Sequence, residues 1–488
     1  MPQRPFSRAQ SFLVPPFFDD WLPPDHAARF VATLLDGFPD EVWQELGVTR
    51  TGHQTGAPRY APEALLAIWI YGFMCGIRSV RGLEAACRDQ VPFRWLSGNQ
   101  TPDHNTLWRF YQSHRTAMAG IFTQTVTIAV RAGMVDWALQ AVDGTRIAAN
   151  ASVTRSLDEA HLAALLVRVE HRIAELEDQQ VASEDDGPPT LPPGLQDATA
   201  RRERIAAALT QVRAGGGPAK ANLTDPEARI MRTRQGFAPA YNAQAVVTAT
   251  TAGSGRLIIA ATVTTAPNDL GLLPEMIEAA EATSGQTAAV TVADTGYHTT
   301  ATLVVCAERG RTVVVPDQRR LALFGQRRGA ADRFPRSAFA YDPATDSYTC
   351  PAGQRLAYRG IKPNGPRKPA QLDYGAGALL CRTCALMAQC TTDTRQGRHL
   401  KIPVGLAVRE RHQVWMATEE ANALSRRRRG MIEPVFGILK ERFAARRWQR
   451  RGLGNVQSEW ALLAAAFNLR TLHRCWVASG AATRLLTA

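Results

Sequence analysis

The chain has 488 residues, a length that predicts roughly two to four domains. Because 45% of the residues are hydrophobic, the composition excludes disorder throughout the chain. With 57 Lys and Arg against 44 Asp and Glu, the net charge is +13, and a surface this basic favours polyanions such as nucleic acid. No apolar run reaches the ~20 residues of a membrane span, and Met1–Pro16 lacks the apolar core of a secretory signal, so we expect a cytoplasmic protein without a membrane partner.

Residues 1–135 are predicted to form a helical N-terminal domain that binds DNA. Apolar residues recur at helical spacing over 64–73, 80–87 and 106–133. Asp103 suits the N-cap of the third helix. A helix-turn-helix fits such a set of helices, but the pattern does not say which helix would contact bases.

Residues 136–316 are predicted to form the first part of an α/β core. A strand over 138–147 is followed by a helical insertion over 153–222 and by a hairpin with strands at 243–250 and 257–265. The remaining elements of this part alternate helix and strand and are predicted over 270–282, 288–293, 299–309 and 312–315. The resulting order is β–β–β–α–β–α–β, which indicates an α/β fold.

The rest of the chain is predicted to contain an insertion and then the end of the core. Residues 317–420 form a basic, loop-rich insertion with a cysteine cluster. Residues 421–478 return to helices that complete this core.

Two aspartates lie in or directly after predicted strands of the core. Asp143 belongs to the strand over 138–147, and Asp294 follows the apolar strand over 288–293. Ligand sites in sheet-based folds gather at strand ends, where loops leave room for a substrate. Joined by a Glu from a helix, the two carboxylates would bind two Mg²⁺ or Mn²⁺ ions, because hard cations prefer oxygen ligands. An aspartate at a strand end is also a common turn former or helix cap, so neither residue identifies a site alone.

Glu433 is one of two glutamates within a strongly basic stretch, residues 425–451, that is predicted to be helical. Arg429 and Lys440 lie four residues before it and seven after it, so a continuous helix would place all three on one face. Pro434 either begins this helix, in which case Arg429 reaches the site from a loop, or lies inside a longer helix and kinks it. Glu433 is then either a metal ligand among phosphate-binding cations or a carboxylate that balances neighbouring Arg charges.

These features resemble the DDE transposases of bacterial insertion sequences, in an insertion-sequence-four-like branch that has a helical N-terminal domain. The resemblance covers about residues 15–475. Three of its segments, which resemble the family's first-Asp strand, the start of the following hairpin and the second-Asp motif, are 141–152, 223–244 and 292–297. The fourth is the spacing Arg-x3-Glu-x6-Lys, formed by Arg429, Glu433 and Lys440. Where the family often has Tyr three residues before this Arg, the chain has Arg426.

The resemblance implies an RNase H-like fold with a mixed five-stranded sheet. It implies that Asp143, Asp294 and Glu433 are catalytic and bind two Mg²⁺ or Mn²⁺ ions. It also implies DNA cleavage at insertion-sequence ends and strand transfer into target DNA, by a homodimer on double-stranded terminal inverted repeats. A bacterial, nucleoid-associated protein is expected. Residues expected to contact phosphates are Arg429, Lys440, Arg426 and Arg442.

Four of the eight cysteines form a cluster with the spacing C-x30-C-x2-C-x5-C. They are Cys350, Cys381, Cys384 and Cys390. In a cytosolic protein this cluster suggests a structural zinc site, or an iron–sulfur cluster, more than disulfides. Zinc would explain how a stretch poor in apolar runs stays ordered. The alternative is four reduced cysteines in an irregular, β-rich insertion.

Three other polar residues near the expected site are predicted to be structural. His298 is expected to be a helix cap or a solvated side chain in preference to a phosphate contact. Asn242 and Gln244 are expected to hydrogen-bond within the sheet. Two other functions fit parts of the pattern: an RNase H-like nuclease without strand transfer, and a catalytically inactive DNA-binding protein descended from a transposase. The full-length resemblance disfavours the first, and the presence of all three carboxylates disfavours the second.

Overall fold

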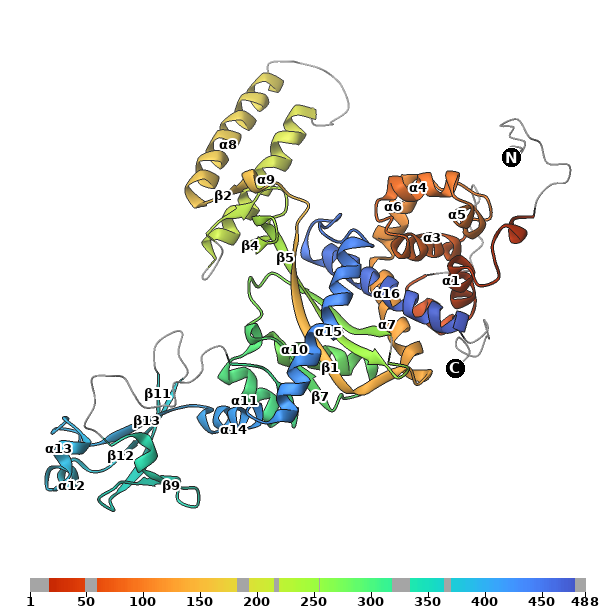
Figure 1. Cartoon of the computed structure of the whole chain (residues 1–488). Coiled ribbons are helices and arrows are strands. Elements are labelled where there is room, and N and C mark those ends of the chain that lie inside the picture. The colour runs from red at the N-terminus through yellow and green to blue at the C-terminus, as the bar shows by residue number, and fades with distance from the viewer. Residues whose placement is uncertain are drawn as a thin grey trace, which may run out of the picture. The chain divides into compact units, whose positions relative to one another are not determined.

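The computed structural model combines helices with several sheets, as the sequence predicts for an α/β protein (Figure 1). The described residues are 17–48, 59–181, 193–214, 219–253, 255–317, 334–363 and 370–478. The chain divides into a larger unit, made of 1–268, 276–288 and 429–488, and a smaller unit, made of 269–275 and 289–428. Among the described helices, none has both the length and the apolarity needed to cross a membrane.

The N-terminal part of the larger unit is helical, as predicted. Its helices are α1 Ala27–Asp36, α2 Asp40–Glu45, α3 Pro62–Met74, α4 Val80–Asp89, α5 Val91–Leu96, α6 His104–Ser113 and α7 Arg115–Arg131. Asp103 caps α6 by accepting a hydrogen bond from the Thr106 N–H at 2.6 Å, which confirms its predicted role. The single helix predicted over 106–133 is wrong. The chain leaves helical geometry at His114, whose φ and ψ are −115° and 28° and whose Nδ1 lies 2.9 Å from the Phe110 carbonyl oxygen.

An antiparallel sheet forms the centre of the larger unit. Strand β1 (Val135–Ala148) pairs with one edge of β5 (Gly236–Thr250), and the other edge of β5 pairs in succession with β4 (Arg229–Thr233) and β6 (Arg256–Thr264). The hairpin of β5 and β6 was predicted, whereas β4 was not. The β4 sequence offers only two adjacent apolar residues between arginines, which is too short a pattern to indicate a strand.

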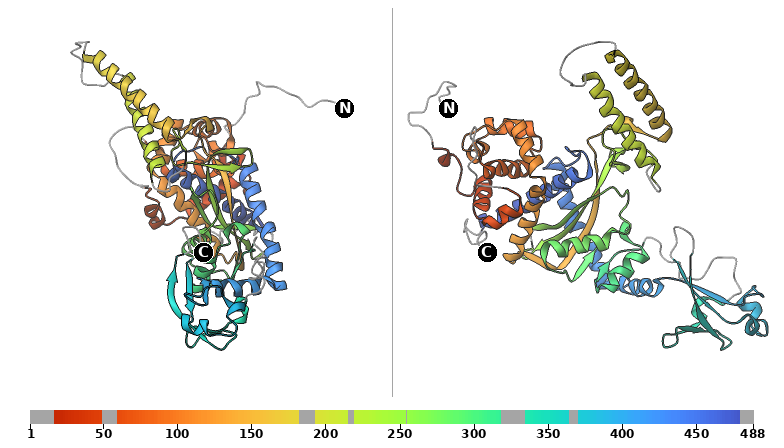
Figure 2. Two further views of the ribbon diagram at one scale, coloured as in Figure 1. Left: turned by 90° about the vertical axis from the view of Figure 1, so that its left-hand side faces the viewer. Right: turned by 180° about the vertical axis from the view of Figure 1, so that it is seen from behind.

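The helical insertion predicted between the first two core strands is a pair of helices. Helices α8 (Glu159–Val181) and α9 (Pro193–Arg213) lie side by side in every view (Figures 1 and 2). They enclose a separate apolar core that includes Leu162 and Ile205. The short strands β2 (Ser156–Leu157) and β3 (Ala221–Asn222), which precede and follow this pair of helices in the chain, pair with each other.

The outer edge of β6 is covered by side chains of the C-terminal helix α16 (Leu453–Ala478). Asn468 accepts a hydrogen bond from the Ile258 N–H and donates one to the Ile258 carbonyl, each at 2.8 Å. Gln457 accepts from the Val263 N–H at 2.6 Å and donates to the Ala261 carbonyl at 3.0 Å. An exposed strand edge offers unpaired backbone groups to other chains, so these amides replace a missing neighbouring strand.

The smaller unit contains a parallel pair of strands and a separate antiparallel sheet. Strands β7 (Val290–Val292) and β8 (Val313–Val314) are parallel, with α11 (Thr300–Glu308) between them in the chain. The second sheet has the order β13-β12-β11-β10-β9. Its strands are β9 Ala340–Asp342, β10 Ser347–Thr349, β11 Arg355–Lys362, β12 Gln371–Gly375 and β13 His399–Pro403.

This second sheet corrects the loop-rich insertion predicted over 317–420. Strands such as β11 are exposed along most of their length, so their sequences lack the alternation of apolar and polar residues that predicts a strand. The helices of this region are α12 Ala378–Arg382, α13 Met387–Cys390 and α14 Leu406–Met416. Two further helices include residues of both units, α10 (Leu272–Ser284) and α15 (Glu419–Glu441).

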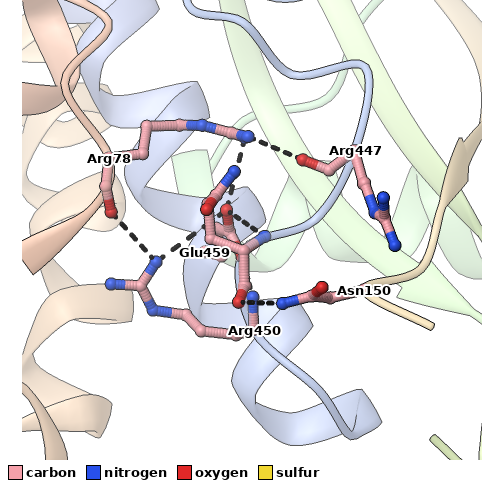
Figure 3. Close-up of polar contacts among 6 residues, drawn as sticks. Arg78, Asn150, Arg447, Arg450 and Glu459 are labelled. Carbon is pink, nitrogen blue, oxygen red and sulfur yellow. Dashed lines mark hydrogen bonds and ion pairs between the residues drawn. The ribbon is translucent and has the colours of Figure 1, made fainter. Parts of the chain in front are cut away.

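A buried carboxylate joins the N-terminal helices to the C-terminal segment of the larger unit (Figure 3). Glu459 of α16 is fully buried, and its oxygens accept hydrogen bonds from the Gln449 and Arg450 N–H groups at 3.1–3.2 Å. Arg78, which follows α3, lies 3.3 Å from Glu459 and also donates to the Arg447 carbonyl at 2.6 Å. The Arg450 guanidinium lies 3.9 Å from the same carboxylate. One acidic group therefore holds three separate chain segments.

We predict that Glu459→Gln lowers the free energy of unfolding by about 3–5 kcal/mol, because it leaves two buried arginines without a counter-charge. Urea unfolding followed by tryptophan fluorescence measures this loss. Glu159→Gln is the matched control, because Glu159 and its partner Arg213 are both largely exposed; its effect should lie within about 1 kcal/mol. Equal midpoints for the two variants would contradict the role given to Glu459.

Candidate active site

Asp143 lies in the middle of β1, opposite Ala245 of β5. Its carboxylate is half-buried, and Oδ1 accepts the N–H of Gly144 at 2.8 Å. Side chains alternate between the faces of a strand, and directly paired residues of neighbouring strands share a face. Gln244 pairs with Gly144 and therefore belongs to the face opposite Asp143.

Asn242 and Gln244 are structural, as predicted. Both are fully buried, and the Gln244 side-chain amide donates to the Asn242 side-chain oxygen at 3.0 Å. The Gln244 backbone carbonyl accepts a hydrogen bond from the Trp460 indole at 2.9 Å. These contacts join the two side chains to each other and the strand to α16.

Helix α15 is continuous through Pro434, so the alternative in which Pro434 begins the helix is wrong. A proline cannot donate to the carbonyl four residues earlier, which here belongs to Gly430. The Arg256 guanidinium donates to that carbonyl at 3.4 Å and replaces part of the missing bond. Arg429 and Glu433 therefore lie one turn apart on the same helix.

The exposed face of α15 presents Glu433. Apolar residues on the opposite face are buried, among them Ile432, Val435 and Leu439. The Glu433 side chain is 65% exposed and its oxygen lies 4.0 Å from Nε of Arg429, which is 79% exposed. An ion pair this exposed contributes little to stability, so Glu433 remains accessible to a ligand.

Lys440 connects α15 with Asp143. Its pKa is lowered, first by burial and then by the Arg446 and Arg234 guanidinium groups, whereas the Asp143 carboxylate acts in the opposite direction. Its ammonium also lies 5.9 Å from the centre of the Phe436 ring. The Asp143 carboxylate is thus within electrostatic range of the lysine that follows Glu433 by two helical turns.

Asp294 belongs to the smaller unit, where it follows β7. Its Oδ1 accepts the Gly296 N–H at 2.8 Å and caps the short 3₁₀ helix Thr295–Tyr297. A Cβ atom at Gly296 would lie 2.9 Å from Oδ1 of Asp294 and 3.5 Å from Oδ2 of Asp269. Two carboxylates therefore approach the space that this glycine leaves open.

Asp269 was not among the residues selected from the sequence. It is buried and lies at the end of the loop that follows β6. The position of an aspartate shortly after an apolar strand was the available signal, and Asp269 shares it with Asp294. In sequence, however, Asn268-Asp269 has the ordinary composition of a turn.

His298 is the C-cap residue of the 3₁₀ helix Thr295–Tyr297, as one of the two predicted roles has it, whereas the predicted solvated side chain is wrong. Its side chain is 6% exposed and its Nδ1 lies 3.8 Å from Oδ1 of Asp317. Its ring centre lies 5.9 Å from that of His412. Burial lowers the pKa of His298, with Asp317 acting in the opposite direction. Thr299 caps α11 by accepting the Thr302 N–H.

A second feature of the larger unit is a basic cavity of about 490 Å³. Its lining contains three arginines, of which Arg78 and Arg450 are buried beside Glu459 and Arg451 is exposed. Within the lining, Arg451 donates to the Asn150 carbonyl at 2.9 Å, and Trp108 is partly exposed. Cationic groups beside an exposed aromatic ring suit a nucleic-acid strand. The lining residues are Arg78, Ser79, Val80, Trp108, Gln112, Asn150, Gln449, Arg450, Arg451 and Asn455.

The remaining predicted phosphate contacts, Arg426 and Arg442, are both exposed. Across the described part of the chain, no three His, Cys, Asp or Glu side chains are arranged to hold a metal ion. The carboxylates of Asp143, Asp294 and Glu433 nevertheless provide the oxygen donors that Mg²⁺ and Mn²⁺ prefer.

Comparison with known families gives two matches. Residues 16–113 match the Transposase domain (DUF772) family, and residues 349–473 match the Transposase DDE domain family. The second match contains Glu433 and the cysteine cluster, whereas Asp143 and Asp294 lie outside both matched ranges. No curated protein and no solved structure has significant similarity to the chain.

We predict that Asp143→Asn lowers the pKa of Lys440 further, because it removes a negative charge that stabilises the ammonium. The pKa is measured by NMR titration of the ¹³C-methylated lysines, with Lys440→Arg used to assign the signal. Asp136→Asn, on the same strand, should leave the Lys440 titration unchanged. An unchanged Lys440 pKa in Asp143→Asn would show that the two groups do not interact.

Proposed function

Because its two domain matches make the chain a DDE transposase, we propose that it cleaves DNA at insertion-sequence ends and transfers those ends into target DNA. In this proposal Asp143, Asp294 and Glu433 bind two Mg²⁺ or Mn²⁺ ions. The substrates are double-stranded terminal inverted repeats and target DNA, held by a homodimer.

The observation that carries the proposal is that α15 is continuous through Pro434, so that Arg429, the exposed Glu433 and Lys440 lie on one helix. Asp143 belongs to the same unit as this part of the helix, and its charge acts on Lys440. Here the carboxylate lies among cations that are suited to phosphates, which is the environment required by phosphoryl transfer.

The two cations, when bound, would activate the attacking water or 3′-hydroxyl and stabilise the leaving oxygen. The protein's own groups supply position and charge. Asp143 is held on a hydrogen-bonded strand, which limits the motion of its carboxylate. Arg429, one turn from Glu433, places its guanidinium beside that carboxylate, where it can contact a phosphate.

DNA would be bound mainly through its backbone. Lys440, Arg429, Arg442 and Arg426 are proposed to contact phosphates close to the cleavage point. The cavity beside Trp108 and Arg451 is proposed to contact DNA farther along the strand, through phosphates and base stacking. Both regions are cationic, which agrees with the net charge of +13.

The catalytic assignment predicts that Asp143→Asn, Asp294→Asn and Glu433→Gln each slow cleavage at least about 100-fold, since each removes a metal ligand. Cleavage and strand transfer are measured with Mg²⁺ on DNA that carries the element's terminal inverted repeats. Asp136→Asn and Glu441→Gln are controls on the same strand and helix and should retain activity.

The outcomes separate the proposed function from its alternatives. Carboxylate variants that cut as fast as wild type would disprove the assignment of the site. Cleavage by wild type without joined products would indicate a nuclease that lacks strand transfer. Specific DNA binding without Mg²⁺- or Mn²⁺-dependent cleavage would indicate an inactive protein descended from a transposase.

The DNA contacts predict a change in salt dependence. Arg429→Gln and Lys440→Gln should each reduce the slope of log K against log[salt] by about 1, the loss of one phosphate contact. Binding is measured by fluorescence anisotropy over a range of salt concentrations. Arg172→Gln on α8 is the control, and a slope reduction equal to those of the site variants would argue against localised contacts.

A further inference from the structure

The four clustered cysteines line one small cavity in the smaller unit. Cys350 follows β10, Cys381 lies in α12, Cys384 follows α12, and Cys390 ends α13. All four side chains line the same cavity, whose volume is about 20 Å³. A space of that size accommodates a single small body, such as one water molecule or one ion.

Backbone N–H groups point at two of the sulfur atoms. The Gln354 N–H donates to Sγ of Cys350 at 3.3 Å, across a turn in which Gly353 has a φ of +74°. The Arg398 N–H donates to Sγ of Cys381 at 3.4 Å. Hydrogen bonds from N–H groups stabilise a thiolate relative to a thiol, and the thiolate is the form that binds metals.

A glycine gives the Cys381 sulfur its space. Gly397 has a φ of +79°, and a Cβ atom there would lie 2.9 Å from the Cys381 Sγ. Any larger residue would displace the sulfur or strain the backbone. The chain thus keeps both a donor and an open volume beside this cysteine.

The thiols are close enough to influence one another. Burial raises the pKa of Cys390, and Cys350, Cys381 and Cys384 add to this effect, whereas Arg398 opposes it. All eight cysteines are free thiols, and those of the cluster are half-buried. Four thiols without disulfide bonds around one space are the ligand set of a structural zinc site.

The segment that carries three of these cysteines has little apolar packing of its own. Helices α12 and α13 have five and four residues, and neither contains a buried residue. Leu379 is 74% exposed and Leu380 is 48% exposed. Contact with the core of the second sheet involves Cys350, Cys381 and Cys390 themselves. A cross-link at the cysteines would therefore fix a segment that hydrophobic burial holds weakly.

We propose that Cys350, Cys381, Cys384 and Cys390 bind one Zn²⁺ ion as a structural, tetrahedral site. In the described residues the four sulfurs share a cavity but are not in ligating geometry. Binding therefore requires their side chains to turn inward to Zn–S distances of about 2.3 Å. The thiols release their protons to solvent as the Zn–S bonds form, so affinity falls at low pH.

This site does not depend on the proposed DNA chemistry, and its test uses metal content. The full chain is purified without added chelator, and zinc and iron are measured by mass spectrometry. We expect one zinc per chain in wild type and at least a tenfold lower content in Cys381→Ser and Cys384→Ser. Cys75→Ser is the matched control, because Cys75 is exposed and lies in the other unit, and it should retain zinc.

A second measurement keeps the proposal testable if a serine variant fails to fold. Wild-type protein stripped of metal is titrated with Co²⁺, which should give the visible absorption of tetrahedral thiolate coordination at one equivalent. Zn²⁺ should displace it and protect Arg382 and Arg395 from trypsin. Stoichiometric iron would indicate an iron–sulfur cluster in place of zinc. Absence of stoichiometric metal, or equal zinc loss in Cys75→Ser, would overturn the proposal.

Discussion

The buried carboxylate of Glu459 connects the main parts of the larger unit. A charge removed from water must be neutralised and hydrogen-bonded, and Glu459 obtains both from Arg78, Arg450 and two backbone N–H groups. Because these partners come from the N-terminal helices and from the segment after α15, the carboxylate fixes those parts against α16. The same segment continues the sheet, since the Trp448 N–H donates to the Ala148 carbonyl at the end of β1 at 2.9 Å. The strand that carries Asp143 is thereby connected to the same cluster.

Two local features of the backbone allow the residues of the candidate site to lie on and beside α15. The first is the continuity of α15 through Pro434, where Arg256 supplies a donor for the Gly430 carbonyl. It keeps Arg429, Glu433 and Lys440 on one helix. The second is Gly76, whose φ is +80° and whose missing Cβ leaves room for the Arg442 carbonyl, which would lie 2.6 Å from that atom. The helical N-terminal part can therefore pack closely against the end of α15, next to Lys440, without displacing it.

Sequence patterns predicted most of the helices and strands that have strong periodicity. They did not predict features that depend on contacts between residues distant in sequence. The apolar repeats found α3 and α4, and β-branched runs found β5 and β6. They missed β4 and the exposed strands of the second sheet, because a strand with few buried side chains carries no alternating pattern. The spacing of Arg429, Glu433 and Lys440 selected residues that share a helix, yet it could not decide the role of Pro434, because the compensating donor, Arg256, is distant in sequence. Asp269 and the buried side chain of His298 were not predicted either, because their neighbours in the structure are distant in sequence.

We propose that Asp143, Asp294 and Glu433 bind the same metal ions. In the test, Fe²⁺ replaces Mg²⁺ and ascorbate generates hydroxyl radicals, which cut the backbone near the bound ion. Mass spectrometry of the fragments should show cuts near all three residues, and excess Mg²⁺ should suppress the three together. Cuts confined to one of the three segments, or cuts that Mg²⁺ does not suppress, would contradict a shared metal site.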